Sequence, residues 1–175
     1  SQERRRLEKK KRVVLFSFIH GVGLFGWAPA MPKKGGPGFF ELFDQVHQTI
    51  ARLAARRSDV EFVIKVKWPG SYPTREVEEC FNLAGFPIGT LPNVLISANL
   101  DAQDLILDSD VVISFGSTTM LEAAIADKPV IVPNFSEAIQ KAYLEYIQLA
   151  DTYDAYDVAV SAEHLERLIE SRLDD

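Results

Sequence analysis

The sequence is poor in the residues that form disulfides and metal sites. Its 175 residues include one cysteine, Cys80, so no disulfide can form within the chain. The three histidines are His20, His47 and His164, and no group of His, Cys, Asp and Glu has the spacing of a zinc site. A disulfide scaffold is therefore excluded, and we expect a site without metal in a reducing, cytoplasmic setting.

Long apolar runs are also missing. No run approaches the roughly 18–20 residues that a membrane span needs. Residues 1–30 have the outline of a signal peptide, with a basic start and an apolar stretch, but Glu3 and Glu8 interrupt the start and His20 interrupts the stretch. Residues 13–19 are moreover needed as a buried strand, so a signal peptide is the weaker interpretation.

Familiar catalytic motifs are absent as well. The sequence has no GxSxG elbow, no Cys–His pair and no Walker lysine motif. Hydrophobic residues make up 47% and charged residues 25% of the chain, which is ordinary for a globular protein. The length predicts one domain, which we place at residues 13–175.

Charge is distributed unevenly along the chain. Residues 1–12 contain seven Lys or Arg and two Glu, whereas the remaining 163 residues contain 12 basic and 23 acidic side chains. The acidic body predicts that the protein does not bind nucleic acid generally. The basic segment 1–12 is interpreted as a solvated linker or helix, although binding to RNA, to an anionic membrane surface or to a protein partner stays open.

Short apolar runs alternate with helical patterns along the whole chain. The strands are expected at 13–19, 60–67, 93–97, 110–114, 129–132 and 157–160, and the helices at 39–57, 75–84, 101–107, 119–127, 139–149 and 162–173. Such alternation predicts an α/β domain in which a parallel sheet has helices on both faces. Ligands of such sheets bind at the carboxyl ends of the strands.

The segment 20–38 leaves the first strand at such an end. It contains Gly21-Val22-Gly23-Leu24-Phe25-Gly26, which matches the GxGxxG pattern of dinucleotide-binding proteins. Prolines soon after it prevent a helix from starting there, and Lys67 stands near the end of the second strand where an acidic residue would hold a ribose. A loop that approaches a phosphate is favoured, and an NAD(P) site is the alternative.

The turn after the fourth strand has the residues of a phosphate site. Gly116, Ser117, Thr118 and Thr119 offer close backbone approach, hydroxyl donors and the free N–H groups of a helix N-terminus. The alternative is ordinary capping, because Thr119 and Glu122 have the spacing of a capping box.

Basic and histidine side chains follow the first two strands. Lys65 and Lys67 share one face near the end of the second strand, where they are suited to neutralise a phosphate or to extend into solvent at the rim of the sheet. His20 ends the first strand and is a candidate to hydrogen-bond a substrate or phosphate. His47 and His164 lie in predicted helices and are interpreted as surface residues.

The stretch DVVISFGSTTMLEAAIADKPVIVP at 110–133 resembles the donor-nucleotide region of GT-B glycosyltransferases. The resemblance implies a Rossmann-like domain with about six strands, in which Gly116, Ser117, Thr118 and Thr119 contact the donor diphosphate and Glu122 binds the ribose. VIKVKWPG at 63–70 looks like the Lys-x-His-Pro segment of capsule and surface-polysaccharide transferases, but the histidine is missing.

This resemblance also implies a substrate, an acceptor and a partner domain. The substrate is expected to be a nucleotide-diphosphate sugar, with no further cofactor, and the acceptor a glycan. GT-B enzymes have two Rossmann-like domains, and this chain resembles the second, so an N-terminal acceptor domain is expected to be missing and the catalytic residues stay unknown. A sugar-nucleotide 2-epimerase has the same architecture and remains an alternative, as does a non-catalytic binding module.

Overall fold

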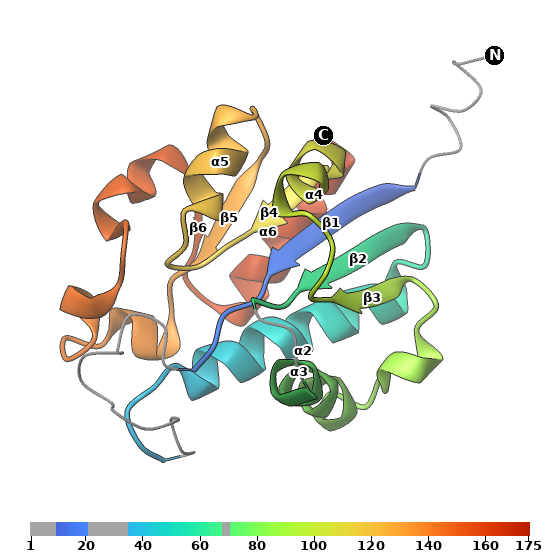
Figure 1. Cartoon of the computed structure of the whole chain (residues 1–175), viewed down its shortest axis with the longest axis horizontal. Helices are drawn as coiled ribbons and strands as arrows, with labels where there is room; N and C mark the ends of the chain where they lie inside the picture. The colour runs from blue at the N-terminus through green and yellow to red at the C-terminus, as the bar shows by residue number, and fades with distance from the viewer. Residues whose placement is uncertain (1–9, 21–34, 68–70) are drawn as a thin grey trace.

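The structure is a computed structural model, which describes residues 10–20, 35–67 and 71–175. It contains a six-stranded parallel sheet in the order β3-β2-β1-β4-β5-β6 (Figure 1). The strands are β1 (Lys11–Phe16), β2 (Val60–Lys65), β3 (Val94–Ser97), β4 (Val111–Ile113), β5 (Val130–Pro133) and β6 (Asp157–Ala159). The predicted α/β architecture is confirmed.

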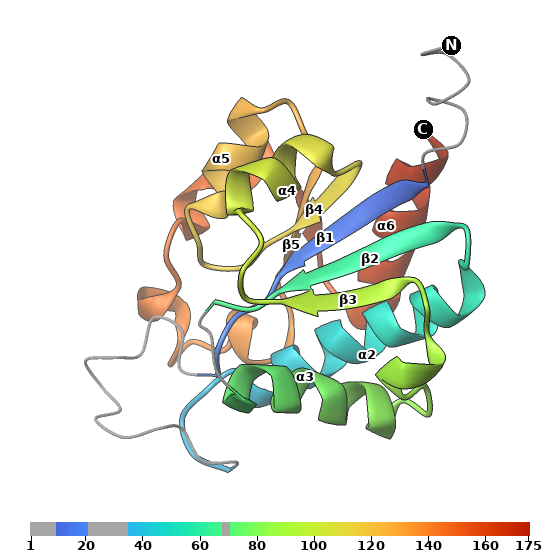
Figure 2. The ribbon, with the colours of Figure 1, turned by 45° about the vertical axis from the view of Figure 1, so that its right-hand side comes forward.

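Helices cover both faces of this sheet, as predicted. They are α2 (Phe40–Arg56), α3 (Ser71–Leu83), α4 (Ala102–Asp108), α5 (Thr119–Ile125) and α6 (Ala162–Asp174), and the short 3-10 turns are η1 (Ile88–Thr90), η2 (Ser136–Ile139), η3 (Leu144–Tyr146) and η4 (Ala150–Ala155). Figure 2 shows α2 and α3 on one side of the sheet and α4 and α5 on the other. None of the helices within the described ranges has the length and hydropathy of a membrane span.

Alternation along the strands divides the core between the two faces. Val13 and Leu15 of β1 pack with α2, α3 and α6, whereas Val14 and Phe16 pack with α4 and α5. Because successive strand side chains point to opposite faces, a strand buried on both faces is a continuous apolar run. This is why β1, β2 and β4 were visible in the sequence.

Most predicted elements appear within a few residues of their expected bounds. Asp101 caps α4 by accepting from Gln103 N at 2.9 Å, and Ser161 caps α6 by accepting from His164 N at 3.0 Å. The differences lie at ends: β1 begins at Lys11 and ends at Phe16, and α3 begins at Ser71.

One predicted helix is wrong. The helix expected at 139–149 is replaced by η2, η3 and the turns around them, and Leu149 has a left-handed φ of 62°. Tertiary contacts oppose a continuous helix here: the Tyr143 ring packs 5.3 Å from that of Phe39, and Ile147 is buried, whereas Ile139 is 61% exposed. The apolar residues at 139–149 have the spacing of one helical face, but they are not buried together on one side of the segment.

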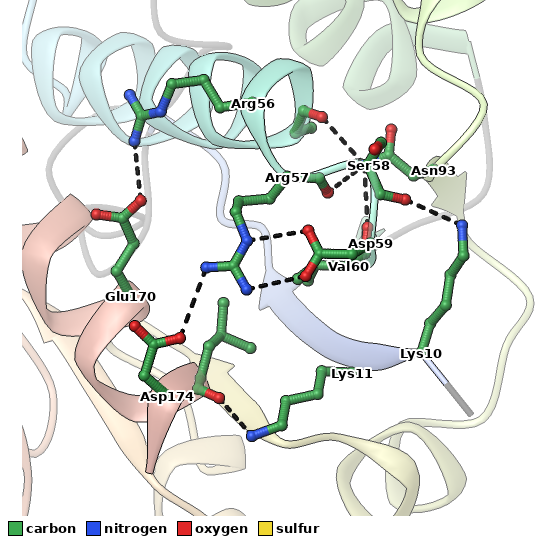
Figure 3. A network of polar contacts seen from close by, with 12 residues as sticks. Lys10, Lys11, Arg56, Arg57, Ser58, Asp59, Val60, Asn93, Glu170 and Asp174 are labelled. Atoms are coloured by element: carbon green, nitrogen blue, oxygen red, sulfur yellow. Dashed lines mark hydrogen bonds and ion pairs between the residues drawn. The ribbon is translucent and has the colours of Figure 1, made fainter. Parts of the chain in front are cut away.

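The amino-terminal edge of the sheet is held by polar contacts (Figure 3). Arg57 pairs with Asp59 at 3.0 Å and with Asp174 at 3.8 Å. Lys10 Nζ donates to Ser58 O at 3.0 Å, and Asn93 Nδ2 donates to main-chain carbonyls that include Val60 O at 2.9 Å. These contacts join α2, α6 and the starts of β1, β2 and β3.

Candidate functional site

A cavity of about 250 Å³ opens where β1, β2 and β4 end. In the sheet, β1 lies between β2 and β4. The chain continues from β1 to α2 on one face and from β4 to α5 on the other, so this is the switch point where open parallel sheets bind ligands. The cavity is lined by Phe16, Ser17, Phe18, Ile19, Lys65, Val66, Lys67, Ala102, Phe115, Gly116, Ser117 and Thr119. Five of the predicted site residues, Lys65, Lys67, Gly116, Ser117 and Thr119, therefore surround one space.

The turn after β4 carries a chain of hydroxyl groups. Gly116 has a left-handed φ of 57°, a backbone conformation that would be strained for a residue with a side chain. Thr119 Oγ1 donates to Ser117 Oγ at 3.1 Å and lies 2.7 Å from Ser114 Oγ. Since Thr119 has one hydroxyl proton and gives it to Ser117, Ser114 must donate to Thr119. The proton of Ser117 remains for a ligand in the cavity.

The two lysines differ in their surroundings. Lys65 Nζ donates to Ala98 O, in a short hydrogen bond, and to Val66 O at 3.3 Å. Its ammonium is therefore partly engaged with the chain after β3. Lys67 is exposed and lines both the main cavity and a smaller neighbouring one. Lys65 and Lys67 both line the main cavity and both stay candidates to meet an anionic ligand.

His20 lies beside the main cavity, in the lining of the smaller one with Lys67 and Glu76. His20 is 5% exposed, and its ring stacks on Phe40, with the centroids 4.3 Å apart. Burial lowers the pKa of His20 to about 4, because desolvation disfavours the imidazolium. At neutral pH this side chain is therefore an uncharged hydrogen-bonding group.

Thr118 and Glu122 lie away from these residues. Thr118 Oγ1 donates to Glu122 Oε1 at 3.2 Å, and Glu122 lines a second cavity, of about 260 Å³, with Gln103 and Ile125. The capping box expected from the spacing is not formed, because the Thr119 amide donates to Ser117 Oγ at 3.4 Å. The ribose role of Glu122 stays a prediction.

Two further predictions are not tested by the structure. Gly21 and the rest of the glycine motif at 21–26 lie outside the described residues. Over residues 10–20, 35–67 and 71–175, no three His, Cys, Asp or Glu side chains are grouped to hold a metal ion. That the site needs no metal stays a prediction.

Sequence reasoning missed a hydrogen-bonded pair at the cavity wall. His47 was interpreted as a surface residue, which is wrong: it is fully buried, and its Nε2 lies 2.9 Å from Ser17 Oγ. The signal was present, since position 47 follows Phe43 by four residues and precedes Ile50 by three, on the apolar face of α2. A polar residue on that face needs a partner, and Ser17 at the end of β1 is one.

Solved structures share this fold at low sequence identity. The UDP-GlcNAc 2-epimerase of Neisseria meningitidis, bound to UDP-GlcNAc, has a TM-score of 0.60 and 14% identity over 99% of this chain and 38% of its own. The Staphylococcus aureus protein MnaA, bound to UDP, has a TM-score of 0.61 and 14% identity over 100% of this chain and 39% of its own. The Escherichia coli heptosyltransferase WaaC, with ADP, has a TM-score of 0.54 and 11% identity over 94% and 45%.

No protein-family model and no curated protein sequence matches the chain. The chain spans about 40% of the length of the two 2-epimerases from Listeria monocytogenes and Neisseria meningitidis that it matches. Its fold is that of one Rossmann-like half of the GT-B glycosyltransferases and UDP-GlcNAc 2-epimerases.

Proposed function

We propose that this chain is the nucleotide-sugar-binding half of a GT-B-like enzyme. The observation that carries the proposal is the cavity at the switch point, where the Gly116 turn, the Ser117 and Thr119 hydroxyls and Lys67 meet. The Ser117 hydroxyl, whose proton is not used within the turn, and an ammonium group are the chemistry that binds a diphosphate. Proteins with the same fold that contain UDP, UDP-GlcNAc or ADP support the choice of ligand.

The primary reaction proposed is transfer of a sugar from its nucleotide to a glycan acceptor. Breaking the glycosidic bond leaves negative charge on the diphosphate, which hydrogen-bond donors fixed in advance stabilise. Ser117 and Lys67 would supply that stabilisation from this chain without a metal or further cofactor. We assign no general base here, because the proposed acceptor domain would complete the cleft. Surface-polysaccharide synthesis at the inner face of the membrane is the setting proposed.

A 2-epimerase is the second candidate, and the comparisons favour it by a specific observation. The 2-epimerase from Neisseria matches at a TM-score of 0.60, against 0.54 for the heptosyltransferase. In the complete enzyme the two reactions have different products. A transferase leaves the sugar on its acceptor, whereas an epimerase inverts the sugar at its second carbon, and proton NMR of the sugar distinguishes them.

A nucleotide panel tests the proposed binding. UDP, GDP, ADP, CMP, CDP and NADP are titrated into nitrogen-15-labelled wild type, Lys67→Met and Lys10→Met. Lys10 is the matched control, because it is exposed at the opposite edge of the sheet. We expect one nucleoside diphosphate to bind, about tenfold more weakly to Lys67→Met, as the loss of one charge-assisted contact predicts. Lys10→Met should bind as wild type does.

Three results would count against the proposal. Equal affinity of wild type and Lys67→Met would remove the lysine from the site. Selective binding of NADP would favour the dinucleotide alternative. Absence of any shift at millimolar nucleotide would contradict nucleotide binding by this chain.

A further inference from the structure

The imidazole of His47 is held by its own helix. Nδ1 of His47 lies 2.7 Å from Phe43 O, the carbonyl one turn earlier in α2. A carbonyl oxygen only accepts hydrogen bonds, so Nδ1 must carry the proton. In the neutral ring, Nε2 then has a lone pair and no proton.

The neutral ring is the form that its surroundings favour. His47 is fully buried, and the aromatic rings of Phe43 and Phe18 lie 4.0 and 6.1 Å from it between centroids. Desolvation in this apolar packing lowers the pKa of His47 to about 4. At neutral pH Nε2 is therefore an acceptor.

The hydroxyl of Ser17 is the partner of that acceptor. Ser17 Oγ lies 2.9 Å from Nε2, so its single proton is donated to His47. Ser17 also lines the main cavity, where its oxygen can present only lone pairs. Ser117, which lines the same cavity, differs because it receives the Thr119 proton and keeps its own.

We infer that Ser17 is the specificity-determining hydrogen-bond acceptor of the cavity and that His47 is the positioning residue that fixes this polarity. The ligand group that Ser17 receives is a donor, either a hydroxyl or an N–H. This inference rests on the proposed function for the identity of the ligand. In a nucleotide sugar, the diphosphate lies toward Ser117 and the donor group toward Ser17.

This arrangement gives the cavity a direction. A phosphate oxygen, an ether oxygen or a fluorine placed next to Ser17 Oγ has no proton to donate. The two acceptors would then repel each other, and neither would have a hydrogen bond. A site built to receive a hydroxyl rejects an analogue without it more strongly than an apolar pocket rejects a missing methylene. We expect the loss of the donor to weaken binding about tenfold or more.

The tautomer of His47 is the first test, and it needs no ligand. Nitrogen-15 correlation spectra of the imidazole rings at neutral pH report which nitrogen is protonated. The inference expects a protonated Nδ1 and an unprotonated Nε2 at His47. A protonated Nε2 would make Ser17 an acceptor from His47, would free its proton for the ligand and would overturn the inference.

Ligand analogues provide the second test. The probes are UDP-GlcNAc, its monodeoxyfluoro analogues at each sugar hydroxyl, and UDP methylated on the N–H of the base. One analogue should bind wild type about tenfold more weakly than its parent, and this penalty should disappear in Ser17→Ala. A fluorinated analogue would identify a sugar hydroxyl as the donor, and the methylated base would identify the N–H. Equal penalties in wild type and Ser17→Ala would overturn the inference.

Two substitutions of His47 separate positioning from packing. Gln at position 47 offers an acceptor near the place of Nε2, so His47→Gln should retain the discrimination, whereas His47→Leu should lose it because Ser17 regains its proton. Melting curves identify any variant that is unfolded. If both variants still discriminated between the parent ligand and its analogue, the role of His47 would be overturned.

The result for wild type separates the two claims. A wild-type chain that binds none of these nucleotides contradicts the proposed function. The polarity of Ser17 is then decided by the His47 tautomer alone.

Discussion

At the residue scale, His47 shows how burial changes the chemistry of a side chain. Its ring is fully buried and both nitrogens have partners, in Phe43 O and Ser17 Oγ. Its pKa of about 4 lies below the ordinary value near 6.5, because the charged form loses its hydration. In the unfolded chain the same ring takes up a proton near the ordinary pKa.

This difference predicts a pH dependence of stability. Between about pH 6.5 and pH 4 the unfolded state binds more protons than the folded state, so stability falls as the pH falls through this window. The shift corresponds to about 3 kcal/mol for His47. We expect urea unfolding of wild type to lose more stability between pH 7 and pH 4 than that of His47→Gln.

His164→Gln serves as the control, because His164 lies at the start of α6 and is only partly buried. Its profile shows how much of any change comes from replacing a histidine outside the core. Parallel profiles of wild type and His47→Gln would contradict the assignment of the shift to His47.

Residue roles in the cavity were only partly predictable. The pattern at Lys65 and Lys67 correctly indicated cationic side chains near the end of a strand. It did not show that Lys65 would donate to Ala98 O, because that contact depends on β3 as a neighbour. Glu122 differs, because its partner Thr118 lies only four residues earlier, at the N-cap of α5.

At the scale of elements, a buried carboxylate joins η2 to α2. Both oxygens of Glu137 accept from the first turn of the helix, from Glu41 N at 2.9 Å and Leu42 N at 2.8 Å. The N-terminal amides of a helix have no partner within it, and its dipole favours an anion there. Glu137 therefore provides from a distant segment the cap that Phe39, at the N-cap position, does not supply.

Removing one acceptor oxygen and the charge should weaken this link. We expect Glu137→Gln to lower the free energy of unfolding by about 1–3 kcal/mol, since one buried amide loses its partner. Glu145→Gln is the matched control, because Glu145 is exposed on η3 nearby. Urea denaturation measures both variants, and equal stability of the two would show that the cap contributes nothing.

The same segment explains why one element was predicted wrongly. The helix at 40–56 was evident because its apolar residues repeat on one face and are buried. Residues 139–149 have similar spacing, but Glu137 and Tyr143 are bound to the start of α2. The turns that result depend on contacts with a helix about a hundred residues earlier, which periodicity does not contain.

At the scale of the whole molecule, alternation of strands and helices was sufficient to predict the architecture. When parallel strands are joined by right-handed crossovers, few arrangements of strands and helices are possible. The strand order was not predicted, and it decides which loops meet. Because β1 lies between β2 and β4, Ser17, Lys67 and Ser117 come to one cavity although a hundred residues separate the first and the last.

The two edges of the sheet also differ. Figure 3 shows the amino-terminal edge, where Arg57 pairs with Asp59 and where Lys10 and Lys11 bind main-chain carbonyls. Arg12 and Glu61 form a further ion pair at this edge. Exposed ion pairs contribute about 0–1 kcal/mol each to the free energy of unfolding. These pairs therefore position the elements more than they stabilise the fold. The cavity lies at the opposite edge, which is where the proposed ligand is expected.

The most direct test of the central claim is amide chemical-shift mapping of the chain with UDP-GlcNAc, at concentrations up to the millimolar range. We predict saturable shifts centred on residues 116–119, with further shifts at 17–19 and 65–67 and none around Arg57 and Asp174. Shifts confined to the amino-terminal edge, or no saturable shift at all, would contradict the account.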